Sequence, residues 1–164
     1  MNLSKPALLS GSALLLSACQ SLPDLSDRSV STYIDPANAP RIEAALPENR
    51  PSETPAGQSG VYLLADPHDA FAARAVLIEH ADHTLDIAYY IWHNDVSGKM
   101  LFQMLQQAAQ RGVRVRLLLD DNNTRGMDDV LAALDAEANI EIRLFNPFLH
   151  RRFRALGYLT DFPR

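Results

Sequence analysis

Apolar and polar positions alternate from residue 61 onward in a pattern that predicts four strands separated by three helices. The expected strands are residues 61–64, 84–92, 113–119 and 140–145. The segments between them carry apolar residues three and four positions apart, the spacing of a helix with one buried side. Strands that alternate with helices in this order predict an α/β fold. We therefore expect a mostly parallel sheet with right-handed crossovers and flanking helices.

Capping residues mark the ends of the first expected helix. Asp66 has the side chain of an N-cap, Pro67 suits the first helical position, and the apolar pattern fades near His80. The residues on the apolar side of this helix are Phe71, Ala75, Leu77 and Ile78. Its start is therefore expected at residue 67 and its end close to residue 80.

The second and third helices have similar signals. Asn94 or Asp95 is expected to cap the second helix, which ends at Arg111 with a glycine at C′, Gly112. The apolar side of that helix is Met100, Leu101, Met104, Leu105 and Ala108. The third helix starts at the acidic pair Asp128-Asp129, shows Val130, Leu131 and Leu134, and is expected to run to Asn139.

Residues 113–119 form the most apolar of the expected strands. Leu117, Leu118 and Leu119 follow one another without a polar residue between them. A continuous apolar run is typical of a parallel strand that is covered on both faces. The pattern therefore predicts that both sides of this strand are buried.

Chemistry-bearing residues follow two of these strands, where sites of parallel sheets are found. Tyr90 and Trp92 end one strand, and Asp120, Asn122 and Asn123 end the next. The aromatic residues have an equally good explanation as core packing, and the Asp-Asn run as turn formers and helix caps. Acid–base work by His93 with Asp95, or a divalent cation at Asp120-Asp121, has only weak support from the sequence.

The first nineteen residues have the pattern of an export signal. The apolar run at residues 7–16 is too short to cross a bilayer but has the length of a signal-peptide core. It leads into Leu16-Ser17-Ala18-Cys19, which resembles the bacterial lipobox. We therefore expect a lipoprotein signal peptide at residues 1–18 and lipid attachment at Cys19, palmitate included. The alternative is an ordinary secretory peptide with an incidental cysteine.

Residues 19–60 contain six prolines and no sustained apolar periodicity, so they are expected to be a flexible tether. The only cysteine of the chain is Cys19, which excludes an internal disulfide. The residue after it, Gln20, is not Asp, which by the sorting rule of enteric bacteria favours the outer membrane. The expected location is the cell envelope, with the domain facing the periplasm.

The formal net charge of −5 gives no reason to expect a nucleic-acid partner. Basic residues gather near the carboxyl terminus, where Arg151, Arg152, Arg154 and Arg164 face one acid, Asp161. Such a cluster is either a solvated surface or a contact with lipid phosphates.

Several of these motifs occur together in one known superfamily. Tyr89-Tyr90-Ile91-Trp92 is followed by the run at residues 108–121, then by residues 123–126 and 143–148. In this order they resemble the amino-terminal half-domain of the phospholipase D superfamily, and most of all bacterial cardiolipin synthase-like lipoproteins. The resemblance covers residues 61–164, which implies an incomplete phospholipase D-like half-domain there.

The resemblance also implies a mechanism. Members of the family carry two His-x-Lys-x4-Asp motifs, and transfer phosphatidyl groups through a phosphohistidine without metal or cofactor. The five histidines of this chain are not followed by Lys two positions later, since its only lysines are Lys5 and Lys99. We therefore expect an amino-terminal part of such an enzyme that is truncated before the first motif, lacks catalytic residues and is inactive alone.

Two kinds of partner follow from this interpretation. The first is membrane phospholipid, reached through the lipid anchor, and the second is a further half-domain or protein partner. The alternative function is a lipoprotein module that docks on anionic lipid or on another protein through residues 151–154.

Overall fold

A computed structural model describes Ser26, residues 29–34 and 39–45, Pro55, residues 57–148, Arg151, Arg154, Ala155 and Gly157, except for the side chains of Glu43 and Ala45. The expected signal peptide at residues 1–18, Cys19, Arg152, Asp161 and Arg164, with the predictions made for them, lie outside these residues. Residues 34–147 belong to one compact unit, and the fold below is that of its described part. In the second unit, the Arg154 guanidinium lies 5.2 Å from the centre of the Phe148 ring.

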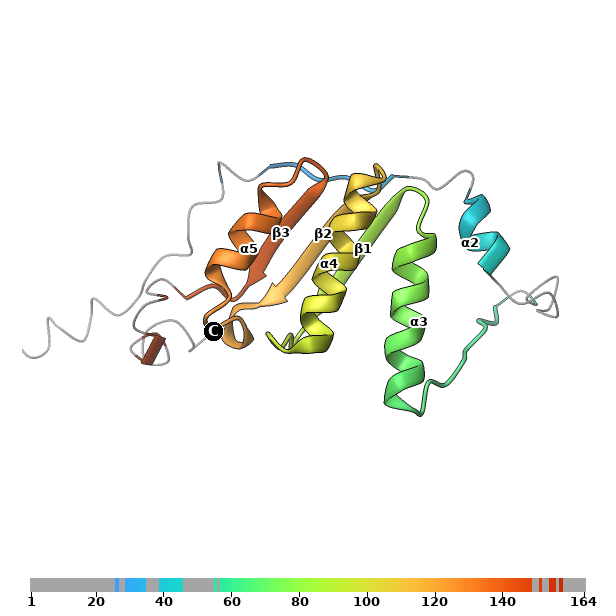
Figure 1. Cartoon of the computed structure of the whole chain (residues 1–164), viewed down its shortest axis with the longest axis horizontal. Coiled ribbons are helices and arrows are strands. Elements are labelled where there is room, and N and C mark those ends of the chain that lie inside the picture. The colour runs from blue at the N-terminus through green and yellow to red at the C-terminus, as the bar shows by residue number, and fades with distance from the viewer. Residues whose placement is uncertain are drawn as a thin grey trace, which may run out of the picture. The chain divides into compact units, whose positions relative to one another are not determined.

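The unit is an α/β structure with a parallel sheet, as predicted (Figure 1). The elements in chain order are α2 (Pro40–Ala45), α3 (Pro67–His80), β1 (Thr84–Tyr89), α4 (Val96–Gln110), β2 (Arg114–Asp120), the 3-10 turn η1 (Asp121–Asn123), α5 (Asp128–Asp135) and β3 (Ile140–Phe145). The sheet order is β1-β2-β3, and both strand pairs are parallel. The bounds of β3 are those that the sequence pattern predicts.

The predicted helix ends are confirmed by their hydrogen bonds. Asp66 caps α3 by accepting from the backbone N–H groups of His68 and Asp69, and Asp95 caps α4 by accepting from that of Gly98. Gly112 follows α4 with a φ of +94°, the left-handed conformation that glycine adopts without strain. One helix ends earlier than expected, because α5 stops at Asp135 and not near residue 139.

The core lies between the helices and one face of the sheet. Its fully buried centre includes Leu105, Val113, Val115 and Leu119. The side chains of Leu85, Ile87, Ile142 and Leu144 pack against it from the outer strands. Arg111 at the end of α4 donates to the carbonyl oxygens of Ile78 and Glu79, both at 3.0 Å, and so joins the ends of α3 and α4.

The first expected strand, residues 61–64, is not a strand in the structure. The segment is extended but has no strand partner among the described residues, and the side chains of Val61, Tyr62 and Leu63 are more than four-fifths exposed. It approaches α3 from the side of that helix that faces away from the sheet (Figure 1). Apolar composition alone does not form a strand without a neighbouring ladder to bond with, and the described sheet has three strands, not four.

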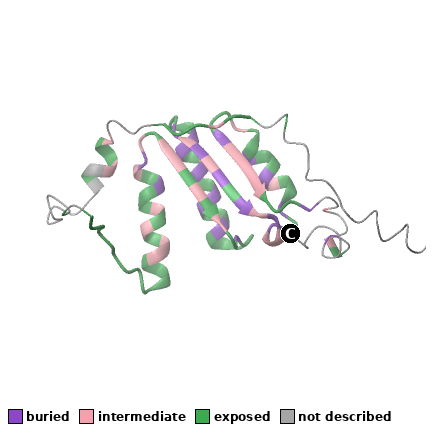
Figure 2. Cartoon of the chain, turned by 180° about the vertical axis from the view of Figure 1, so that it is seen from behind, coloured by how far each residue is buried: buried purple, intermediate pink, exposed green. Residues whose placement is uncertain are grey.

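The prediction that β2 is covered on both faces is also wrong. Leu117 and Leu119 are buried under the helices, whereas Leu118 is 41% exposed on the opposite face. Helices α3, α4 and α5 lie on one face of the sheet, and the reverse view shows the other face with exposed positions along the strands (Figure 2). Leu77 of α3 is likewise 53% exposed and does not belong to the buried side of its helix.

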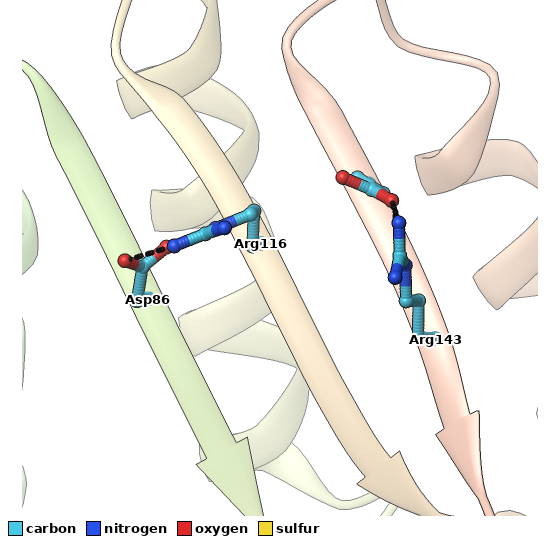
Figure 3. Close-up of polar contacts among 4 residues, drawn as sticks. Asp86, Arg116 and Arg143 are labelled. Carbon is cyan, nitrogen blue, oxygen red and sulfur yellow. Dashed lines mark hydrogen bonds and ion pairs between the residues drawn. The ribbon is translucent and has the colours of Figure 1, made fainter. Parts of the chain in front are cut away.

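Ion pairs occupy part of this uncovered face. Asp86, Arg116 and Glu141 stand opposite one another in the register of the three strands. The Arg116 guanidinium binds both carboxylate oxygens of Asp86 across the sheet, whereas Arg143 pairs with Glu141 of its own strand (Figure 3). The hydrogen bonds from Arg116 hold the pKa of the Asp86 carboxyl below its ordinary value of 3.8.

This lowered pKa predicts a pH-dependent contribution of Asp86 to stability. A carboxyl whose pKa is lower in the folded chain stabilises the fold above its unfolded pKa, and loses that contribution as the pH falls through the folded pKa. We expect Asp86→Asn to lower the unfolding midpoint slightly near neutral pH and to make no difference well below pH 3.8. Urea unfolding of both proteins across this pH range measures the effect, and a difference that persists in acid would contradict it.

The predicted tether contains a short described helix. The backbone N–H groups of Arg41 and Ile42 in α2 donate to Asp82 Oδ2 at 3.1 and 3.3 Å, and the Arg41 side chain donates to the carbonyl of Glu79 at 2.8 Å. These bonds attach α2 to the end of α3. The boundary between tether and domain at residue 61 stays a prediction.

Candidate functional site

The carboxyl ends of β1 and β2 bring the two predicted clusters together. Asn123, at the end of η1, donates a hydrogen bond from Nδ2 to the backbone carbonyl of Tyr90 at 2.8 Å. Asp120 ends β2, and its side chain accepts from the backbone N–H of Asn122 at 2.9 Å. Tyr90 and Asn123, which belong to different predicted clusters, are therefore in contact at this edge of the sheet.

A shallow depression of about 340 Å³ lies beside these residues, on the uncovered face of the sheet. It is lined by Ala88, Tyr89, Tyr90, Leu118, Asp120 and Phe145. In the strand register, Ala88 stands opposite Leu118 and Asp120 stands opposite Phe145, so the lining comes from all three strands. The surface is mostly apolar, and the lining residues with polar side-chain atoms are Asp120, Tyr89 and Tyr90.

Tyr90 and Trp92 occupy different environments although they are two residues apart. Tyr90 is 68% exposed and lines the depression, whereas Trp92 is 5% exposed. The Trp92 ring stacks on Phe102 at a centroid distance of 4.6 Å and meets Tyr89 edge-on at 5.1 Å. The strand ends at Tyr89, before the turn that takes Trp92 under α4. Trp92 therefore has the environment of a core residue.

The acidic run after β2 serves the local structure. Asp121 is fully buried, and its Oδ1 accepts the hydroxyl hydrogen of Thr124 at 2.6 Å. Asp120 caps η1, as the turn-former explanation predicts. In the described part of the chain, no three His, Cys, Asp or Glu side chains come together as metal ligands.

Among the described hydrogen bonds, none joins the side chains of His93 and Asp95 as an acid–base pair would require. Asp95 accepts from the Gly98 backbone N–H and from the Ser97 hydroxyl, and these bonds, in that order, lower the pKa of its carboxyl. A carboxylate held ionised as a helix cap is a weak proton acceptor at neutral pH. This side chain therefore positions the start of α4.

Leu118 and Phe145 are part of the depression although the sequence analysis did not select them. Leu118 was expected to be buried, and Phe145 was identified only as the end of a strand and as part of the family-like run at residues 143–148. Side chains of a strand alternate between its two faces, so Leu118, next to the buried Leu117 and Leu119, belongs on the second face of the sheet. The same alternation places Phe145 opposite to its neighbour Leu144, which packs against the core. Whether that face is covered does not follow from the alternation.

Comparison with known proteins adds the family to this geometry. The sequence model of the family described as "Cardiolipin synthase, PLD-like domain" matches residues 75–156, half of the 164-residue chain. The chain belongs to this family. The matched residues include all three strands, the helices α4 and α5, and the edge that carries Tyr90, Asp120 and Asn123.

Relatives in several bacteria are similar to part of this PLD-like chain. "Cardiolipin synthase C" of Escherichia coli is 61% identical over 108 residues, which are 66% of this chain and 23% of that protein. An uncharacterized protein of Helicobacter pylori is 37% identical over 108 residues, 65% of this chain and 22% of its own. "Cardiolipin synthase 2" of Staphylococcus epidermidis is 35% identical over 65 residues, 40% of this chain and 13% of its own. The chain thus spans less than a quarter of these relatives.

Proposed function

We propose that this chain is the amino-terminal part of a phospholipase D-family phosphatidyltransferase of the cardiolipin synthase type. The observation that carries the proposal is the 61% identity to a cardiolipin synthase over 108 residues, together with the family match. The proposed substrate is membrane phospholipid, and the proposed reaction is the transfer of a phosphatidyl group to an alcohol through a phosphohistidine.

In this proposal the chain contributes scaffold and site rim, and not the reacting groups. Tyr90, Asp120, Asn122 and Asn123 are proposed to border the place where phospholipid approaches. The Asn123–Tyr90 hydrogen bond supports this role, because it holds the two strand ends at a fixed separation. Trp92 is proposed to support the rim from the core beneath it.

The test compares two lengths of the protein. The first is the 164-residue chain, and the second is the product of the same reading frame extended until it contains two His-x-Lys-x4-Asp motifs. We expect the long form to convert labelled phosphatidylglycerol vesicles to cardiolipin and the 164-residue chain to stay at the level of the buffer. Cardiolipin or phosphatidic acid formed by the short form, or an extended frame without these motifs, would overturn the proposal.

We further propose that the chain is exported and that Cys19, its one cysteine, carries the lipid that holds it at the membrane. Two or more acyl chains hold a protein firmly, since each buried methylene contributes about 0.8 kcal/mol. No described helix is long and apolar enough to cross a membrane. The proposed place is the periplasmic side of the cell envelope, at the outer membrane.

Removal of the thiol is expected to release the protein from the membrane. Cys19→Ala should move the chain from the detergent phase to the aqueous phase in detergent partition of expressing cells, and should abolish incorporation of labelled palmitate. Ser17→Ala, which keeps the thiol, is the matched control. Equal palmitate incorporation in Cys19→Ala and in the parent chain would exclude the anchor.

The alternative function, a module that docks on anionic lipid through residues 151–154, makes a different prediction. It requires the chain to bind vesicles through charge, and binding that falls as salt rises would favour it. Sedimentation of Cys19→Ala with vesicles containing phosphatidylglycerol separates the two, because the transferase proposal does not require this binding.

A further inference from the structure

A groove of about 540 Å³ lies between the amino-terminal turns of α3 and α4. Its lining includes Phe71, Tyr89, Met100 and Leu101, with Val96 at the first position of α4. It opens at the end of the sheet where the strands terminate, because α3 and α4 both start at that end (Figure 1). The groove is therefore on the same edge as the candidate site.

Apolar side chains on this edge are unusually exposed. Val96 is 76% exposed and Met100 47%, and the residues directly after β1, Tyr90 and Ile91, are 68% and 47% exposed. Tyr89 lines both the groove and the depression beside the candidate site, so the two surfaces meet at this residue. Exposed apolar side chains gathered in one place mark an interaction site.

The charges around the groove restrict what it can bind. Asp66 bonds to His68 and Asp95 bonds to Ser97, and His68 and Ser97 both line the groove. The described cations near the groove are Arg74, whose guanidinium lies 6.0 Å from the Tyr89 ring centre, and the exposed Lys99, and Arg125 lies further along the edge after β2. Asp120 at the end of β2 adds a carboxylate to Asp66 and Asp95. The carboxylates are at least as numerous as the cations, so an anionic surface gains no attraction here.

We propose that this edge docks on the surface of a zwitterionic phospholipid bilayer, with Val96, Met100 and Tyr90 inserted among the lipid chains and the α3–α4 groove open to an acyl chain. This inference rests on the proposed function, which requires phospholipid to reach the carboxyl ends of the strands. Exposed aliphatic side chains gain free energy in the apolar layer, and a tyrosine suits its boundary. The charge balance fits neutral headgroups and makes the docking insensitive to salt.

The test uses local probes, because the whole chain reaches vesicles through its amino-terminal segment as well. In a full-length Cys19→Ser background, Met100→Cys and Val96→Cys are labelled with the fluorophore NBD. Leu77→Cys is the matched control, since Leu77 is a similarly exposed apolar residue of α3 that does not line the groove. Vesicles are made of phosphatidylcholine, with or without phosphatidylglycerol and with a nitroxide-labelled lipid as quencher.

The expected result is about a twofold or larger rise in NBD emission at residues 96 and 100 on phosphatidylcholine vesicles, with quenching by the labelled lipid. The probe at residue 77 should remain as in water, and salt should not change the result. Insertion only on anionic vesicles, or equal signals at all three positions, would overturn the proposal. A rise without vesicles that grows with protein concentration would assign the groove to a second copy. The outcome is independent of cardiolipin formation by the long form, so the docking surface and the proposed function can fail separately.

Discussion

Trp92→Ala is expected to destabilise the domain by about 3–5 kcal/mol, the range for removal of a large aromatic side chain from a core. The indole ring is 5% exposed and stacks on Phe102 of α4. Its loss leaves a cavity under the start of α4, which the rigid sheet cannot close. Because domains of this size are stable by only about 5–15 kcal/mol, this substitution removes a large part of the total.

Two companion variants make this prediction specific. Tyr90→Ala should change stability by no more than about 0.5 kcal/mol, because that side chain is 68% exposed. Trp92→Phe should cost less than Trp92→Ala, because it keeps an aromatic ring next to Phe102. It removes a smaller part of the side chain, including the ring nitrogen, which has no hydrogen-bond partner among the described residues. Urea unfolding followed by far-ultraviolet circular dichroism measures all three. Similar losses for Tyr90→Ala and Trp92→Ala would contradict the assignment of Trp92 to the core.

The contrast between these two residues shows how far sequence reasoning reaches. Alternation in residues 84–92 places Tyr90 and Trp92 on the same face of one strand. The strand ends at Tyr89, and the turn that follows gives the two side chains opposite environments. An alternating pattern does not mark where a strand leaves its sheet, because turn residues can continue the pattern by chance.

The elements with explicit end signals were predicted well. Asp66-Pro67, Asp95 and Gly112 act through local hydrogen bonds and local backbone geometry, which a sequence specifies directly. Residues 61–64 and Leu118 were predicted wrongly because strand pairing and burial depend on which other parts of the chain lie beside these residues. Those parts are distant in the sequence, and an apolar residue looks the same in the sequence whether it is buried or exposed.

For the candidate site, the meeting of Tyr90 with Asn123 could be predicted from topology alone, since parallel strands end at one edge of a sheet. The roles of Asp121 and Asp95 could not be predicted from the sequence, because a carboxylate can be a helix cap, a buried hydrogen-bond acceptor or a proton acceptor in catalysis. Their hydrogen bonds to Thr124 and Gly98 decide between these roles. The α3–α4 groove arises from packing between helices and had no signal in the sequence.

Gly98→Ala is expected to destabilise the domain by about 2–3 kcal/mol, within the range for forcing an extra group into a packed site. A Cβ at this position would lie 2.0 Å from the backbone oxygen of His93 and 2.9 Å from Nε1 of Trp92. The backbone oxygen cannot move aside without shifting the turn that joins β1 to α4. Helix propensity alone predicts the opposite sign, because Ala in place of Gly inside a helix gains about 1 kcal/mol.

Gly60→Ala is the matched control for this substitution. Gly60 lies in an extended exposed segment, and a Cβ there would meet no atom within 4 Å. We expect its unfolding midpoint in urea to be unchanged, whereas that of Gly98→Ala falls. A Gly98→Ala protein as stable as the parent chain, or more stable, would show that the turn after β1 relaxes freely. In that case Trp92 would not be held against the start of α4, and the support that Trp92 is proposed to give to the rim residue Tyr90 would not be rigid.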